Sequence, residues 1–203
     1  MVRQDLKKKF KMKDLGELKF FFGIEFSRSK DGILMNQRKY ALELVAKIGL
    51  AGSKPVATPL EFNHKLTYVE FDKFVQNDSP VVDELLEDRS KYQRVVGRLL
   101  YLTMTRPNIS FVVQVLSEHM HAPKQSHMDA AVRVIKYIKG TTGFGLFMPA
   151  VQTNQLLAYC DSDWGAYMET RKSVTGYIVK LGNAIVSLKS KKQSTVSRSS
   201  AES

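Results

Sequence analysis

The pattern of apolar positions divides the chain into a strand-rich beginning, a helical middle and a strand-rich end. Residues 19–26 are rich in β-forming side chains and are followed by a turn at 30–32 and a second apolar run, which predicts a β-hairpin. Apolar residues between Tyr40 and Ile48 then recur at helical spacing and stop at Gly49. This pattern predicts a helix that ends with a glycine cap.

Three amphipathic helices are predicted in the middle of the chain. The first carries its apolar positions over 92–102, and the second runs from about 108 to 120. The third is expected to open with a capping-box pattern at Ser126 and to end before Gly140.

From residue 144 the apolar period becomes that of strands. Four strands are predicted in succession, and their order indicates an antiparallel meander whose open face would need helices that the sequence does not supply. Cys160 lies in an apolar strand pattern, so we expect a buried thiol. The predicted fold class is α+β, and the expected strands are 145–148, 156–160, 174–181 and 184–188.

The charge balance is the unusual part of the composition. The 203 residues carry a net charge of +11, which suggests a polyanionic partner such as nucleic acid or an anionic membrane surface, or else a basic but unspecialised surface. No run of about 18 apolar residues occurs, so no bilayer span is expected. The single cysteine and the lack of a signal-peptide pattern indicate an intracellular protein whose compartment the sequence does not distinguish.

The charges are also spread unevenly. Residues 1–30 carry nine Lys or Arg against four Asp or Glu. Residues 61–88 are acidic, lack a clean apolar period and contain Pro80, which predicts a linker or a poorly ordered loop. Basic residues return after the last strand, where they could contact nucleic-acid phosphates or form a solvated tail. These residues are Lys189, Lys191, Lys192 and Arg198.

Short motifs follow one another in a fixed order along nearly the whole chain. They include Met12-Lys13-Asp14-Leu15-Gly16, Phe22-Gly23-Ile24-Glu25, Arg106-Pro107-Asn108-Ile109-Ser110, Val134-Ile135-Lys136-Tyr137-Ile138-Lys139-Gly140 and Asp161-Ser162-Asp163-Trp164. In this order the motifs resemble the Pol polyprotein of copia-type LTR retrotransposons.

The resemblance implies a domain layout. Residues 1–60 would be the end of a reverse transcriptase palm and the start of its thumb, 61–88 an acidic linker, 89–143 a helical thumb and connection, and 144–203 the truncated start of a ribonuclease H domain. The expected architecture is therefore a palm- and thumb-like hairpin and helix, a helical connection and an incomplete ribonuclease H-like sheet.

The same resemblance identifies the segment Phe22-Gly23-Ile24-Glu25 as a primer grip, with an RNA–DNA hybrid or another nucleic acid as its partner. From the residues alone, the rings of Phe20, Phe21 and Phe22 could stack on bases. Core packing is the simpler expectation for most of them.

The resemblance also bears on catalysis. The family's polymerase carboxylates include an Asp-Asp pair upstream of the Met12 motif, and this chain contains no such pair. Asp161 matches the first metal-binding carboxylate of ribonuclease H, at the end of a central strand, although it could equally cap a loop. The next metal ligand would follow Ser203, and Glu202 is expected to face away. The intact family enzyme would use Mg²⁺ or Mn²⁺, and we expect no tight binding here, because two-metal hydrolysis needs several carboxylates.

Three functions follow as alternatives. The chain could be a retrotransposon polymerase fragment that keeps nucleic-acid affinity without turnover. It could be a portion of an active RNA-directed DNA polymerase and ribonuclease H polyprotein. It could also be an inert, degraded reading-frame product that aggregates through exposed apolar surface.

The four histidines are not spaced like a zinc site, and His119 and His121 should lie on different helix faces.

Overall fold

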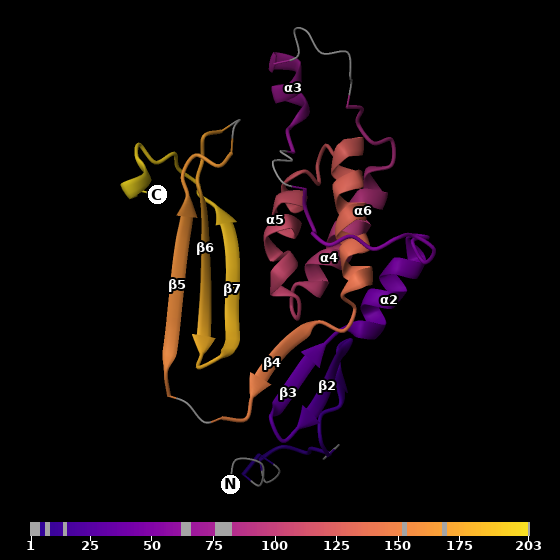
Figure 1. Cartoon of the computed structure of the whole chain (residues 1–203), viewed down its shortest axis with the longest axis vertical. Helices are drawn as coiled ribbons and strands as arrows, with labels where there is room; N and C mark the ends of the chain where they lie inside the picture. Colours follow the sequence, from indigo (N-terminus) through magenta and orange to yellow (C-terminus); the bar gives the residue numbers. More distant parts are fainter. Residues whose placement is uncertain are drawn as a thin grey trace.

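The computed structural model describes residues 5–6, 9–13, 16–61, 66–75, 83–151, 154–167 and 170–202. Helices form a central body, one small sheet lies at one end of it, and a second sheet lies beside it (Figure 1). The mixture of helices and antiparallel strands confirms the α+β class. The elements are β1 (Phe20–Phe21), β2 (Ile24–Ser29), β3 (Gly32–Asn36), α2 (Arg38–Lys47), α3 (Val69–Val75), α4 (Arg89–Leu102), η1 (Pro107–Ile109), α5 (Ser110–Glu118), α6 (Gln125–Gly140), β4 (Gly145–Pro149), β5 (Leu156–Asp163), β6 (Val174–Leu181), β7 (Ala184–Lys192) and η2 (Ser200–Glu202).

The first sheet has the order β1-β2-β3-β4, and all its pairs are antiparallel. The predicted hairpin is confirmed as β2 and β3. The predicted four-strand meander is wrong in one strand, because β4 pairs with β3 and not with the later strands. Two features explain this pairing: β4 follows α6 closely, and Gly145 has no side chain. A Cβ at Gly145 would overlap the carbonyl oxygen of Met35, so only glycine allows this approach.

The second sheet has the order β5-β6-β7, again antiparallel, with an irregularity between Val179 and Lys180. It lies beside the helical body with β7 on the near side (Figure 1). In the described part of the chain β5 is therefore an edge strand, not the central strand expected for Asp161. Cys160 is exposed, so the expectation of a buried thiol was wrong: β5 has a partner on one side only, and Cys160 faces solvent.

The hydrophobic core lies between helices α2, α4, α5 and α6. Each helix buries the apolar stripe that its sequence period predicts. Tyr92, at the centre, is fully buried, and its hydroxyl donates to the carbonyl oxygen of Leu116 at 2.7 Å. The core residues are Ala41, Leu44, Val45, Tyr92, Val95, Val96, Leu99, Leu102, Ile109, Val112, Val113, Leu116, Met128, Ala130, Ala131, Val134, Ile135 and Ile138.

The helix ends agree with the sequence in one case and differ in another. After α2, Gly49 is left-handed with φ +77°, and the amides of Gly49 and Leu50 donate back to Ala46 and Val45, which confirms the glycine cap. Helix α6 begins at Gln125 after the N-cap Lys124, slightly before the predicted cap at Ser126.

The acidic segment 61–88 is not a free linker in its described residues. It contains α3, and Asp88 caps α4 by accepting from the amide of Lys91 at 3.1 Å. Glu61 pairs with Arg133 of α6 at 2.7 Å. Lys124, the N-cap residue of α6, pairs with two further carboxylates of this segment, Asp72 and Asp83. Residues 62–65 and 76–82, including Pro80, lie outside the described residues.

A membrane-spanning helix would need a long apolar stretch, and no helix among the described residues has one.

Candidate nucleic-acid contacts

The turn between β1 and β2 brings Phe22 to the surface. Phe21 pairs with Ile24, so Phe22 and Gly23 form a two-residue loop, and both are left-handed, with φ +46° and +75°. Left-handed angles at both central positions are those of a type I′ hairpin turn, which favours Asn-Gly. A bulky residue is rare at the first of these positions.

The strained turn is anchored to helix α4. The hydroxyl of Tyr101 donates a hydrogen bond to the carbonyl oxygen of Phe22. A Cβ at Gly23 would lie 3.3 Å from that hydroxyl, so the glycine makes room for the contact. Tyr101 is in turn held edge-on against Tyr40 of α2, with ring centroids 5.0 Å apart. The helical body therefore fixes the turn, while the Phe22 ring projects outward.

The aromatic cluster on this turn is exposed. The side chains of Phe20, Phe21 and Phe22 are 58%, 54% and 74% exposed. The expectation that most of them pack in the core was wrong, because β1 is the short edge strand of its sheet. The rings of Phe21 and Phe22 meet edge-to-face at 4.4 Å. The structure thus offers aromatic surface to a partner at this point.

The rest of the predicted primer-grip segment has a structural role. Ile24 is half-buried. Glu25 Oε1 accepts a hydrogen bond from the amide of Lys39 at 2.9 Å, in the first turn of α2. A carboxylate at a helix N-terminus satisfies a free amide and interacts favourably with the helix dipole. Phe22 is therefore the member of the segment that is free to contact a ligand.

The four predicted basic residues do not form one cluster. Lys189, Lys191 and Arg198 are exposed. The side chain of Lys192 is only 18% exposed and points to the opposite face of β7 from Lys189 and Lys191, because alternate residues of a strand face opposite sides. The amide of Arg198 donates to Glu202 Oε2 at 3.0 Å, which ties η2 back onto the chain.

Lys192 belongs to an internal network that joins β7 to α5. Its ammonium lies 3.3 Å from Glu118 Oε2 and 3.8 Å from the ring centroid of Tyr167. The hydroxyl of Tyr167 donates to Glu118 Oε1 at 2.6 Å. Burial, followed by this hydrogen bond to Glu118, raises the pKa of Tyr167. The network holds the second sheet against the helical body, so Lys192 is not available to a phosphate.

Asp161 is exposed on β5, and its Oδ1 accepts a hydrogen bond from the amide of Ser162 at 2.9 Å. Across the residues placed by the structure, no group of three His, Cys, Asp or Glu side chains could hold a metal ion. The residues present therefore do not fit a two-metal centre around Asp161.

One buried polar cluster has no clear signal in the sequence. Lys124 is 2% exposed, and its ammonium pairs with Asp72 and, at 3.0 Å, with Asp83. Burial opposes the charge of Lys124, but its hydrogen bonds to the two carboxylates outweigh this and raise its pKa. Asp83 also accepts from the amide and hydroxyl of Ser126, which caps α6 from a distant segment. The sequence alone does not show which of the many acidic residues in 61–88 pair with Lys124, because the tertiary fold decides which carboxylates lie near its ammonium.

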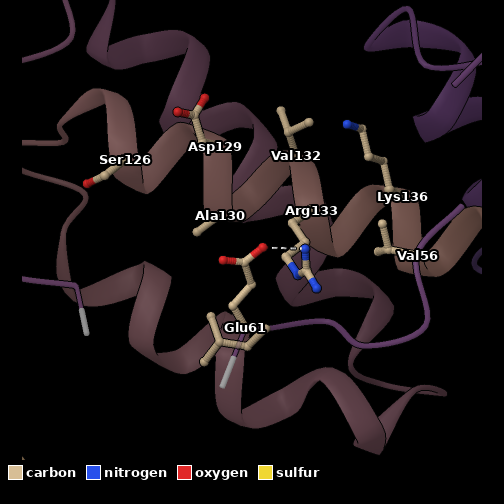
Figure 2. A pocket seen from close by; sticks show the side chains of 9 residues that line it. Val56, Glu61, Ser126, Asp129, Ala130, Val132, Arg133 and Lys136 are labelled. Atoms are coloured by element: carbon tan, nitrogen blue, oxygen red, sulfur yellow. Dashed lines mark hydrogen bonds and ion pairs between the residues drawn. The ribbon is translucent and has the colours of Figure 1, made fainter. Parts of the chain in front are cut away.

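A pocket of about 380 Å³ lies between α6 and residues 56–61. Figure 2 shows Glu61 and Arg133 joined as an ion pair in its lining, and Arg133 also donates to the hydroxyl of Thr58 at 3.1 Å. The pocket carries charges of both signs over an apolar floor, so no class of ligand is singled out. Its lining residues are Val56, Leu60, Glu61, Ser126, Asp129, Ala130, Val132, Arg133 and Lys136.

Comparison with known proteins identifies relatives along the full chain. The profile of a family described as reverse transcriptase (RNA-dependent DNA polymerase) matches residues 1–62. The Retrovirus-related Pol polyprotein from transposon RE1 of Arabidopsis thaliana is 39% identical over 98% of this chain. The uncharacterized mitochondrial protein AtMg00810 of the same plant is 37% identical over 100% of this chain and 79% of its own length. The chain belongs to the Pol polyprotein family of copia-type LTR retrotransposons.

The match extends beyond one species. The Retrovirus-related Pol polyprotein from transposon TNT 1-94 of Nicotiana tabacum is 30% identical over 99% of this Pol-family chain. The chain covers 13% of the length of the RE1 polyprotein and 15% of that of TNT 1-94. It therefore corresponds to a limited part of a Pol polyprotein. No solved structure is significantly similar to it.

Proposed function

We propose that this part of a Pol polyprotein binds nucleic acid through the Phe22 turn and has no catalytic turnover of its own. In this proposal residues 1–60 serve as the palm end and thumb start, 89–143 as the thumb and connection, and 144–203 as a ribonuclease H-like segment. The observation that carries the proposal is the strained, outward-facing Phe22, held from behind by Tyr101.

The conformation of Phe22 supports a binding role. Holding a bulky side chain in the left-handed region costs on the order of 1–3 kcal/mol, and such strain clusters at functional sites. The strain here places a ring in solvent, where it contributes little to the core. Aromatic rings stack on bases of any sequence. The net charge of +11 adds an electrostatic attraction to phosphates.

The site of Asp161 supports the second half of the proposal. Hydrolysis by two metal ions needs several converging carboxylates, and among the described residues Asp161 belongs to no group of three His, Cys, Asp or Glu side chains that could hold a metal ion. In the intact family enzyme, divalent metal would be held by carboxylates that this chain does not bring together.

The test is binding of a labelled RNA–DNA hybrid that carries a single-stranded overhang, because the Phe22 ring can stack only on unpaired bases. Binding is measured across a salt series, with Mg²⁺ or Mn²⁺ present and the label followed for cleavage. We expect salt-sensitive binding that Phe22→Ala weakens roughly 5- to 150-fold, the range that corresponds to loss of about 1–3 kcal/mol of stacking. Phe111→Ala is the matched control, because Phe111 is also exposed, at 51%, but lies on α5. It should leave the affinity unchanged.

Three outcomes would contradict the proposal. Equal binding by Phe22→Ala and the unchanged protein would remove the turn from the site. Cleavage that Asp161→Asn abolishes would show that the chain completes a catalytic centre, as expected for a portion of an active polyprotein. An absence of binding at low salt would favour an inert product.

A further inference from the structure

The register of the second sheet sorts its polar residues onto two faces. Cys160, Tyr177 and Lys189 lie directly opposite one another across β5, β6 and β7. Cross-strand neighbours share a face, and the face alternates along each strand. The next row on the same face contains Ser162, Thr175 and Lys191. We call the surface made by these six residues the Tyr177 face.

The Tyr177 face carries no negative charge. The only acidic residues within strands β5, β6 and β7 are Asp161 and Asp163, and both lie one position out of register with Cys160 and Ser162. They therefore point to the opposite face. Lys192 lies on that opposite face as well, where Glu118 of α5 contacts it. The helical body thus approaches the Asp161 side of the sheet near β7.

The Tyr177 face is open to solvent at its centre. Tyr177 is 41% exposed, and Cys160, Lys189 and Lys191 are also exposed. The Nε2 group of Gln193 donates to Thr175 Oγ1 at 2.8 Å, which fixes the polar end of the face. The arrangement places one aromatic ring at the centre of the surface, with Lys189 beside it and Lys191 one row further along.

We propose that the Tyr177 face binds single-stranded nucleic acid, with a base stacked on Tyr177 and the phosphates contacted by Lys189 and Lys191. This inference rests on the proposed nucleic-acid binding and adds a second surface, separate from the Phe22 turn.

The composition of the face selects the single-stranded form. Stacking on a side chain needs an unpaired base, and sheet faces with central aromatic rings bind single strands in this way. A base in a duplex is already stacked on both sides and cannot reach Tyr177. Two lysines without acidic neighbours suit a phosphate backbone. An anionic membrane would be attracted by the same lysines but would gain nothing specific from the tyrosine ring.

The experiment uses the full chain and a labelled single strand of about 12 nucleotides, titrated across a salt series. Lys189→Gln and Lys191→Gln should each reduce the slope of log K against log salt by about 0.7, the value for one phosphate contact on a single strand. Lys180→Gln is the matched control, because Lys180 lies in the same sheet but faces the Asp161 side. It should leave the slope unchanged.

The tyrosine has an equally close control. Tyr177→Leu should weaken binding roughly 5- to 150-fold without changing the salt slope, because it removes stacking and no charge. Tyr159→Leu changes a tyrosine of 55% exposure on the opposite face and should have no effect. The chain's only thiol, Cys160, lies beside Tyr177, so bound oligonucleotide should slow its reaction with a thiol reagent.

Several results would overturn the inference. Equal losses in Tyr177→Leu and Tyr159→Leu, tighter binding of a duplex of the same sequence, or unprotected Cys160 at saturation would each do so. Competition by anionic vesicles that is unaffected by Tyr177→Leu would show a membrane-binding surface instead. If Phe22→Ala weakens hybrid binding while the Tyr177-face variants leave single-strand binding unchanged, the proposed function stands and this inference fails.

Discussion

At the scale of single residues, Phe22 works against its own backbone preference. The first position of a type I′ turn favours Asn or Gly, and Phe22 occupies it with φ +46° and a ring that is 74% exposed. An exposed ring gains little from burial, so the local conformation carries a cost that folding alone does not explain. A backbone cost without a gain in packing is typical of a residue that contacts a ligand, which is why we assign Phe22 to binding.

Replacing Phe22 with asparagine should therefore stabilise the protein. Asparagine tolerates the left-handed region, so we expect Phe22→Asn to raise the free energy of unfolding by about 1 kcal/mol. Urea denaturation measures this value. Phe21→Asn is the control, because Phe21 is also exposed but lies in a strand, and it should give no gain. A loss of stability in Phe22→Asn would mean that the contact between the two rings outweighs the strain.

His119 is a second unusual residue, because its imidazole is buried in surroundings that disfavour its protonated form. It is 2% exposed, stacks on His127 with ring centroids 3.9 Å apart, and finds no hydrogen-bond partner for either ring nitrogen within the described structure. Burial, then the charges of His127, Lys124 and Lys192, lower its pKa to about 3. Burial, then the charge of Lys124, lowers the pKa of His127 to about 4, although hydrogen bonding to Thr67 and the charges of Asp83 and Asp72 oppose this.

These two histidines predict acid sensitivity. Both are neutral in the folded protein, whereas an unfolded histidine takes up a proton below about pH 6.5. Their stabilising contribution is therefore complete above that pH and is lost as the pH falls towards 4, at up to about 1.4 kcal/mol per pH unit for each ring. Urea unfolding at a series of pH values between 7 and 4.5 would measure this slope.

The variant His119→Phe keeps an aromatic ring in the stack and removes one titrating group. We expect the slope of stability against pH to fall by about half. His121→Phe serves as the control, because His121 is exposed and only two residues away. An unchanged slope in His119→Phe would assign the acid sensitivity to other groups, such as Asp83, whose lowered pKa acts at still lower pH.

At the scale of elements, the sequence predicts what is encoded locally. The helix over α2 and its cap at Gly49 follow from a short apolar period and one glycine, and both are confirmed. The partner of β4 is a non-local choice, since residues 145–149 fit either sheet by pattern alone. The sequence pattern also did not predict which residues share a face of the second sheet. Lys191 and Lys192 are neighbours in sequence, and only the register places them on opposite faces. The candidate site was therefore predictable as residue types, not as an arrangement.

The pairing of β4 with β3 depends on Gly145. A side chain there would overlap the carbonyl oxygen of Met35 and come within 2.8 Å of Asn36 Cβ. We expect Gly145→Ala to lower the free energy of unfolding by about 1–3 kcal/mol, the usual cost of forcing atoms into a packed position. Gly143→Ala is the control, because a Cβ at Gly143 meets nothing within 4 Å. Equal stability of the two variants would show that β4 can leave β3 at little cost.

At the scale of the whole molecule, the helical body and the second sheet are two parts that lie side by side (Figure 1). One carboxylate connects them: Glu118 at the end of α5 accepts from Tyr167 at 2.6 Å and pairs with Lys192 at 3.3 Å. The hydroxyl of Tyr68, next to α3, also reaches Glu118, at 3.5 Å. A largely buried carboxylate with three partners is strongly coupled to its surroundings, and loss of one charge leaves the other unpaired.

Removing this carboxylate should uncouple the unfolding of the sheet from that of the helices. The chain's single tryptophan, Trp164, follows β5 and donates to the carbonyl oxygen of Ser197, so its fluorescence reports on the sheet. Far-UV circular dichroism at the helix band reports on α4, α5 and α6. We expect the two thermal transitions to coincide in the unchanged protein and to separate in Glu118→Ala, with the fluorescence transition first. Glu43→Ala, an exposed glutamate on α2, should keep them together. Coincident transitions in Glu118→Ala would mean that the packing of β7 on α5 joins the parts without the ion pair.

The variant Tyr167→Phe removes only the hydroxyl that donates to Glu118. We expect a smaller separation between the two thermal transitions than in Glu118→Ala, because Lys192 keeps Glu118 as its partner.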